Sequence, residues 1–255
     1  MRRHQSRGFT LIELIMVIVI SSVLAVGVVQ FIVNSMQGVV DTAGRQQAAI
    51  AGSLAAERIS REVRQALPNS VRVFGATNNC VEFVPVLAAS RYLQDVAALN
   101  TTTWDVISPG AITGFVAVYP IAESVVYPNG TSTAITPATV AFAGGNTVTV
   151  NLGGQTFPSD SPQRRFFVVG QPVSFCGDPS GFIYRYSGYG FDAVAGSSIA
   201  SGTKKTFVNG VNSLMFSYAP STLTRNGVLT FRLVFANAAG EQMLLNQQVQ
   251  VRNVP

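Results

Sequence analysis

The chain has 255 residues, of which 11% are charged and 47% hydrophobic, and its formal net charge is +5. This length allows one large domain or two small ones beyond a membrane anchor. The positive charge does not indicate nucleic-acid binding, because removal of Arg2, Arg3 and Arg7 at the N-terminus would lower it to +2. The only histidine, His4, lies in the same segment, so serine–histidine or cysteine–histidine catalysis and histidine metal sites are excluded from the remainder.

An apolar run follows the basic segment and extends from Phe9 to Val33, with Glu13 as its one charged residue. As a helix it would be roughly 37 Å long, enough to cross a hydrocarbon layer of about 30 Å with some tilt. The preceding arginines predict a cytoplasmic N-terminus and an extracytoplasmic remainder. A carboxylate inside a membrane-spanning segment costs about 2.5–3.5 kcal/mol, which makes Glu13 a functional candidate.

The sequence GFTLIELI at residues 8–15 resembles the processing site of type IV pilins and pseudopilins. The resemblance implies that a prepilin peptidase cuts between Gly8 and Phe9 at the cytoplasmic face and methylates the new amino terminus of Phe9. It also implies an assembly role for Glu13, whose carboxylate would pair with the terminal amine of a neighbouring subunit and so offset two burial costs. The alternative is that Glu13 is a tolerated acid near the membrane edge of an uncleaved anchor.

A helical pattern continues beyond the membrane segment to Leu67, where Pro68 ends it. A single helix from Phe9 to Leu67 would be about 90 Å long, and its amphipathic second half would need an apolar partner. Four glycines could bend it, melt it locally or allow close packing. The predicted apolar row is Met36, Val40, Ala43, Ile50, Leu54, Ile59, Val63, Ala66 and Leu67, and the glycines are Gly27, Gly38, Gly44 and Gly52.

After Pro68 the chain consists of short runs rich in valine, phenylalanine, tyrosine and threonine, which predict β-strands. Residues 88–110 are ambiguous, and residues 111–163 are interpreted as an insertion of exposed strands and loops. The last two strands alternate apolar and polar residues, which predicts a half-buried antiparallel hairpin with a turn at 237–240. The predicted strands are 71–74, 80–86, 115–119, 147–152, 165–169, 172–176, 182–186, 214–219, 228–235 and 243–251.

The two cysteines, Cys80 and Cys176, do not form a Cys-x-x-Cys pattern. On the oxidising side of a bacterial inner membrane they are predicted to form one disulfide. Closing a loop of this size is worth up to about 4.7 kcal/mol in the chain-entropy model. Two buried free thiols are the alternative.

No metal site, cofactor or enzymatic activity is predicted. Asp178, Asp192 and Glu241 could in principle form a carboxylate site, and calcium sites occur in some pseudopilins. These acids are neither clustered in the sequence nor spaced like an EF-hand, so they are interpreted as turn residues.

The resemblance to pilins implies an α+β fold, in which a long N-terminal helix packs on an antiparallel β-sheet head. The expected organisation is a cytoplasmic leader at 1–8, a membrane-spanning half of the helix at 9–33, an amphipathic half at 34–67 and a β-rich periplasmic or extracellular head at 68–255. Many major pilins carry a bending proline late in the apolar half, and this chain has none there.

The C-terminal region provides a second resemblance. Residues 211–218 and 228–233 are similar to J-type pseudopilins, and residues 249–255 resemble the MshO family of minor pilins from mannose-sensitive haemagglutinin (MSHA) pili. This implies a minor pilin that initiates filament assembly, with other minor and major pilins, prepilin peptidase, and indirectly a platform protein and assembly ATPase as partners. The implied location is the bacterial inner membrane, and later the pilus at the cell surface.

Two alternatives stay open: a J-type pseudopilin of type II secretion, and a tip adhesin or DNA-uptake minor pilin. The local cationic signals are the doublets Arg164–Arg165 and Lys204–Lys205. They are interpreted as solvated loop charges, and no nucleic-acid partner is predicted.

Overall fold

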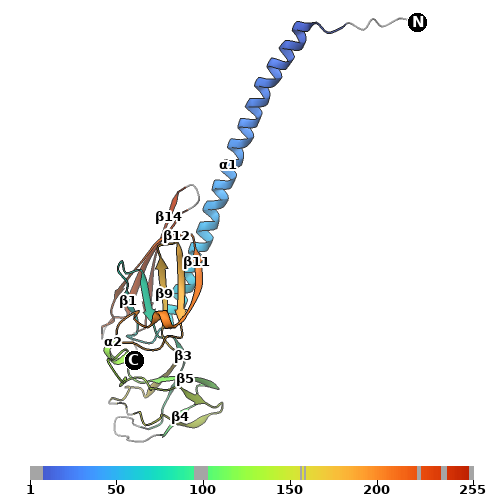
Figure 1. Ribbon diagram of the computed structural model, residues 1–255. Coiled ribbons are helices and arrows are strands. Elements are labelled where there is room, and N and C mark those ends of the chain that lie inside the picture. Colours follow the sequence, from blue (N-terminus) through green and yellow to red (C-terminus); the bar gives the residue numbers. More distant parts are fainter. Residues whose placement is uncertain are drawn as a thin grey trace, which may run out of the picture.

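The computed structural model describes residues 8–94, 103–155, 157, 159–222, 225–236 and 240–252. A long helix projects from a β-rich head, and its N-terminal end lies farthest from the head (Figure 1). The predicted α+β architecture is thereby confirmed. The elements are α1 (Leu11–Arg64), β1 (Arg72–Phe74), β2 (Cys80–Phe83), β3 (Val86–Arg91), β4 (Thr103–Ile107), β5 (Ile112–Ala117), α2 (Glu123–Val126), β6 (Val140–Phe142), β7 (Thr147–Asn151), β8 (Arg165–Val169), β9 (Val173–Asp178), β10 (Phe182–Ser187), η1 (Ile199–Ser201), β11 (Thr203–Asn209), β12 (Val211–Ala219), β13 (Gly227–Ala236) and β14 (Gln242–Val251).

Helix α1 ends three residues earlier than predicted, at Arg64 rather than Leu67. Gln65 caps it: the Gln65 N–H donates to the Glu62 carbonyl at 3.1 Å, and the Ala66 N–H donates to the Val63 carbonyl at 3.0 Å. The chain then pairs with another strand, because the Leu67 N–H donates to the Val84 carbonyl at 2.8 Å. Pairing in a sheet therefore ends the helix before Pro68 can do so.

The face of α1 that packs on the head agrees with the predicted apolar row at Ile59 and Val63 and differs from it nearer the N-terminus. Ile50 and Leu54 are 52% and 61% exposed, and Met36 and Val40 are exposed as well. Small side chains take the inner face, because the helix lies close to the sheet. The buried residues of α1 are Gly52, Ala55, Ala56, Ile59, Ser60 and Val63.

Gly52 shows how close this approach is. A Cβ atom at Gly52 would lie 3.0 Å from Cε2 of Phe235, on β13, and 3.4 Å from Cε of Met243, on β14. A Cβ at Gly27 or Gly38 would meet nothing within 4 Å. Helix α1 continues through all of these positions, so local melting is wrong and close packing explains Gly52.

The first lobe of the head contains a five-stranded sheet, ordered β1-β2-β9-β10-β11, and a three-stranded sheet, ordered β12-β13-β14. Helix α1 contacts β14, β13 and β11, so it packs against both sheets (Figure 1). One hydrophobic core joins the three layers, and its central residues include Ile59 and Val63 of α1, Phe175 of β9, and Phe216 and Phe231 of the three-stranded sheet.

The predicted C-terminal hairpin is confirmed. Strands β13 and β14 pair antiparallel along their whole length. Leu229, Phe231, Leu233 and Phe235 are buried on β13, as the alternation predicts. Residues 237–239 of the predicted turn lie outside the described residues.

A second lobe lies beyond the C-terminal end of α1 (Figure 1). It comprises a four-stranded sheet, ordered β3-β8-β5-β6, and a two-stranded sheet of β4 and β7. Trp104, Val116, Phe142 and Phe166 are buried together in its own hydrophobic core. Residues 111–163 contain strands, as interpreted, but these strands share a buried core instead of lying exposed, and the ambiguous region 88–110 contributes most of β3 and all of β4.

Three further differences concern strand boundaries. The predicted strand 80–86 is divided at Val84–Pro85, because β2 belongs to the five-stranded sheet and β3 to the four-stranded one. Strands β6 and β11 were not predicted. Strand β11 carries the run Thr203–Asn209, whose two lysines and two threonines lack the apolar alternation that identifies a strand.

Cys80 and Cys176 form a disulfide, as predicted. The two residues lie directly opposite each other on β2 and β9, with their Cα atoms 4.2 Å apart. The bond links residues separated by 96 positions in sequence and ties β2, the second strand after α1, to β9, the middle strand of the five-stranded sheet.

A buried ion pair joins neighbouring strands β1 and β2. Arg72 and Glu82 are register partners, and their side chains are 4% and 2% exposed. The Arg72 guanidinium also donates to the carbonyls of Asp192 and Ala193, at 2.7 and 3.0 Å, and lies 3.7 Å from the ring centroid of Tyr127. This arginine therefore connects the sheet to two segments that cover its outer face.

Candidate processing and assembly site

Thr10 forms the N-terminal cap of α1. Its backbone is extended, with φ −78° and ψ 148°, and its Oγ1 accepts a hydrogen bond from the Glu13 N–H at 3.4 Å. The hydroxyl also lies 3.4 Å from Oε2 of Glu13. This is a Thr-x-x-Glu capping arrangement, which satisfies an N–H group that lacks a partner within the helix. Sequence reasoning did not single out Thr10, although this spacing is the signal that identifies it.

Gly8 and Phe9 precede the helix instead of belonging to it, so the prediction that the helix starts at Phe9 is wrong by two residues. Phe9 is 76% exposed, and a Cβ atom at Gly8 would meet nothing within 4 Å. The cap at Thr10 sets this boundary. The peptide bond between Gly8 and Phe9 is consequently accessible and free of helical hydrogen bonding.

The N-terminal half of α1 exposes its apolar side chains on every side. Among the described residues, α1 is the one helix long and apolar enough to span a membrane, and no residue of its most apolar stretch is buried. An apolar surface of this extent requires lipid or neighbouring helices around it.

Glu13 lies in the first turn of α1, at the start of this apolar surface. A carboxylate is favourable there because it faces the positive end of the helix dipole. The first buried residue of the helix, Gly52, is about 58 Å further along the axis at 1.5 Å per residue. No described group of the head can reach Glu13, so the head cannot supply a cationic partner for this carboxylate.

The three acids considered as a carboxylate site do not converge. Asp178 accepts from the N–H and hydroxyl of Ser180, and these hydrogen bonds lower its pKa. Hydrogen bonds from Ser197, Ser198 and Val194 hold the pKa of Asp192 at about 2. Glu241 pairs with Arg45 of α1 at 3.2 Å. Within the described residues there is no group of three or more side chains that could hold a metal ion.

The interpretation of the basic doublets as solvated loop charges holds for Arg164, which is exposed in a loop, but Arg165, Lys204 and Lys205 lie on strands. Arg164 donates to the Leu93 carbonyl at 3.0 Å, whereas Arg165 is the first residue of β8 and lines a groove. Lys204 and Lys205 lie on β11, and the Lys204 ammonium is 3.7 Å from the ring centroid of Tyr184. Arg164 and Arg165 therefore have different surroundings, although they are adjacent in the sequence.

Comparison with known proteins gives one match. Residues 3–29 match the family model described as the prokaryotic N-terminal methylation motif. Neither the curated proteins nor the solved structures contain a match to the chain. The matched segment includes Gly8, Phe9 and Glu13, and it supports a type IV pilin-like N-terminus with a single inner-membrane anchor. It ends before the head, where the likeness to J-type and MSHA proteins stays a prediction.

Proposed function

We propose that this protein is a minor pilin of a type IV pilus of the MSHA kind, which takes part in starting and assembling the filament near its tip. One observation carries the proposal. A methylation motif coincides with an apolar half-helix that is exposed on all sides and carries a single acid in its first turn. This combination is suitable for a subunit that is anchored in a membrane before assembly and then packs against the helices of other subunits.

Processing is the first step. Prepilin peptidase cuts between Gly8 and Phe9 and methylates the amine of Phe9, which removes a leader of residues 1–8. The exposed Gly8–Phe9 peptide and the cap at Thr10 support this, because the cleaved bond lies outside the helix. Residues 9–33 then span the membrane, residues 34–67 extend the helix to the head, and residues 68–255 form the head.

Assembly is the second step. The apolar half of α1 leaves the bilayer and joins the same half-helices of major and minor pilins. Glu13 and the amine of a neighbouring subunit then pair in an apolar environment, where leaving either charge alone would cost several kcal/mol. A platform protein and a cytoplasmic ATPase act indirectly, and the head moves from the periplasm to the cell surface.

A type II secretion pseudopilin of the J type is the second candidate. The sequence likeness of residues 211–218 and 228–233, now placed on β12 and β13, favours it. Both candidates use the same helix and the same processing. They differ in the machine to which the filament belongs.

Deletion of the gene in the native host tests the proposal. We expect surface pili to be lost and the full-length chain to restore them, while export of secreted enzymes stays normal. Electron microscopy of cells and enzyme assays of the medium measure the two outcomes. Normal piliation with lost enzyme export would contradict the pilus assignment and favour the secretion pseudopilin.

A further inference from the structure

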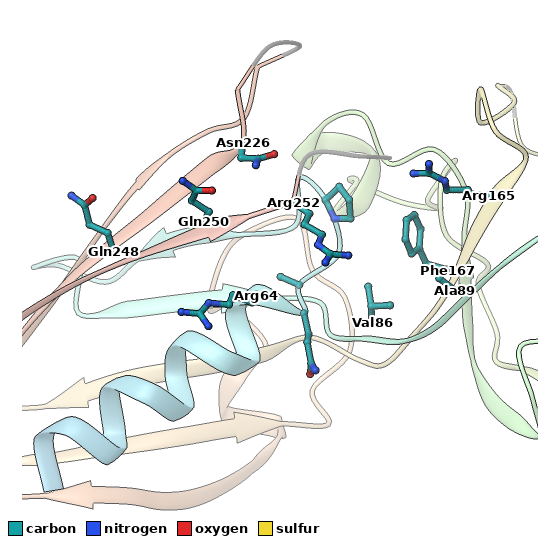
Figure 2. A pocket seen from close by; sticks show the side chains of 12 residues that line it. Arg64, Val86, Ala89, Arg165, Phe167, Asn226, Gln248, Gln250 and Arg252 are labelled. Carbon is teal, nitrogen blue, oxygen red and sulfur yellow. The ribbon is translucent and has the colours of Figure 1, made fainter. Parts of the chain in front are cut away.

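A groove with a volume of about 1270 Å³ lies where the two lobes meet. Its walls are the last turn of α1, the end of β14 and strands β3 and β8 (Figure 2). Three arginines from distant parts of the chain line it: Arg64 at the end of α1, Arg165 at the start of β8, and Arg252 directly after β14. None of the described residues that line the groove is acidic.

The three arginines give the groove a positive charge that is not offset locally. No ion pair joins Arg64, Arg165 or Arg252 to another described residue, although the Arg165 guanidinium donates to Oε1 of Gln163. A cation in the last turn of a helix is favourable, so the helix dipole can explain Arg64 by itself. It does not explain why Arg165 and Arg252 converge on the same groove.

Arginine and carboxamide side chains indicate the chemistry of the ligand. A guanidinium group presents a planar fork of donors that binds carboxylates or phosphates through two hydrogen bonds. Gln248 and Gln250 are both exposed on β14, and Arg252 continues the same alternation. Alternate residues of a strand are about 6.8 Å apart, which is also the repeat of an extended polypeptide.

The position of the groove excludes membrane lipids as its ligand. Arg64 lies roughly 46 Å along α1 from Val33, the end of the predicted membrane segment, at 1.5 Å per residue. The volume is larger than a single inorganic anion needs. Phe167 is the one aromatic side chain among the described lining residues, whereas single-stranded nucleic acids are bound by several stacking aromatics.

We propose that this groove binds an extended acidic segment of another protein. Its carboxylates pair with Arg64, Arg165 and Arg252, while Gln248 and Gln250 hydrogen-bond its backbone or side chains. The strand-like repeat of the exposed side chains of β14 matches alternate residues of the bound segment. The proposal does not depend on the function proposed above.

Fluorescence anisotropy with the full chain in a nonionic detergent tests this. The probe is a fluorescein-labelled octapeptide in which glutamate alternates with threonine. We expect Arg64→Gln, Arg165→Gln and Arg252→Gln each to weaken binding about three- to fivefold, as for exposed charge-assisted pairs, and binding to weaken with added salt. Lys205→Gln, which removes the same charge from β11, should leave binding unchanged.

Two further measurements test whether the guanidinium geometry matters beyond its charge, and whether the variants are still folded. Arg252→Lys keeps the charge but not the planar fork, and it should bind with intermediate affinity. Each variant should retain the thermal unfolding midpoint of the parent. The proposal is overturned if the arginine variants bind like the parent, if a peptide with glutamine for glutamate binds equally well, or if labelled oligothymidylate or oligogalacturonate binds more tightly than the peptide.

Discussion

Replacing Glu13 with alanine is expected to leave the protein cleaved and folded but to reduce its incorporation into fibres by about a hundredfold or more. The variant leaves the amine of the neighbouring subunit without a partner in an apolar environment, and breaking a buried ion pair costs about 3–5 kcal/mol. The head should be unaffected, because no group of it reaches Glu13. Immunoblotting of sheared pili and of membranes from a strain with only this variant measures the ratio.

Two control variants define what Glu13 does. Glu57→Ala removes an exposed acid from the extramembrane half of α1, so incorporation should stay normal. Thr10→Ala removes the helix cap, at about 1 kcal/mol, while Glu13 remains. If Thr10→Ala impairs incorporation as strongly as Glu13→Ala, the acid acts through capping. Normal piliation with Glu13→Ala as the only copy would refute its assembly role.

Replacing Arg72 with methionine is expected to destabilise the head by about 3–5 kcal/mol at pH 7. The change leaves the Glu82 carboxylate buried without its ion-pair partner and deprives the carbonyls of Asp192 and Ala193 of their donor. Chemical denaturation followed by circular dichroism measures the loss. Arg72→Met combined with Glu82→Leu should recover much of it, because two apolar side chains require no charge compensation.

The stability lost in Arg72→Met should depend on pH, because the buried Glu82 carboxyl can take up a proton. Burial raises the pKa of the Glu82 carboxyl, and Arg72 opposes that shift. Without Arg72 the pKa of Glu82 in the folded state is higher still, so the carboxyl stays protonated to a higher pH in the folded chain than in the unfolded one. The free energy of unfolding therefore falls as the pH rises from the ordinary pKa of 4.5 to the raised one. The destabilisation by Arg72→Met should therefore be smaller at pH 4 than at pH 7. An equal loss at both values would show that Glu82 is not the cause.

The sequence alone was sufficient to predict the features that depend on local pattern or composition. The apolar run, the methylation motif, the alternating strands β13 and β14, and the disulfide between the two cysteines needed no tertiary information. The exact start of α1 at Leu11 was also predictable, since the Thr10-x-x-Glu13 spacing identifies the cap.

Features that depend on contacts between distant segments were not predictable. The inner face of α1 consists of glycine, alanine and serine around Ile59 and Val63, because Phe235 approaches the helix too closely for larger side chains. The predicted apolar row includes Ile59 and Val63, which are buried, but it also includes Ile50 and Leu54, which remain exposed. The convergence of Arg64, Arg165 and Arg252 depends on how the two lobes meet, which spacing in the sequence does not reveal.

Mass spectrometry of the N-terminus of the protein purified from its native host tests the central claim most directly. The account predicts a mature chain that begins with N-methylated Phe9 and lacks residues 1–8. A chain that retains an intact Met1 would contradict it, because no amine would then form at the edge of the apolar helix to pair with Glu13 of a neighbour.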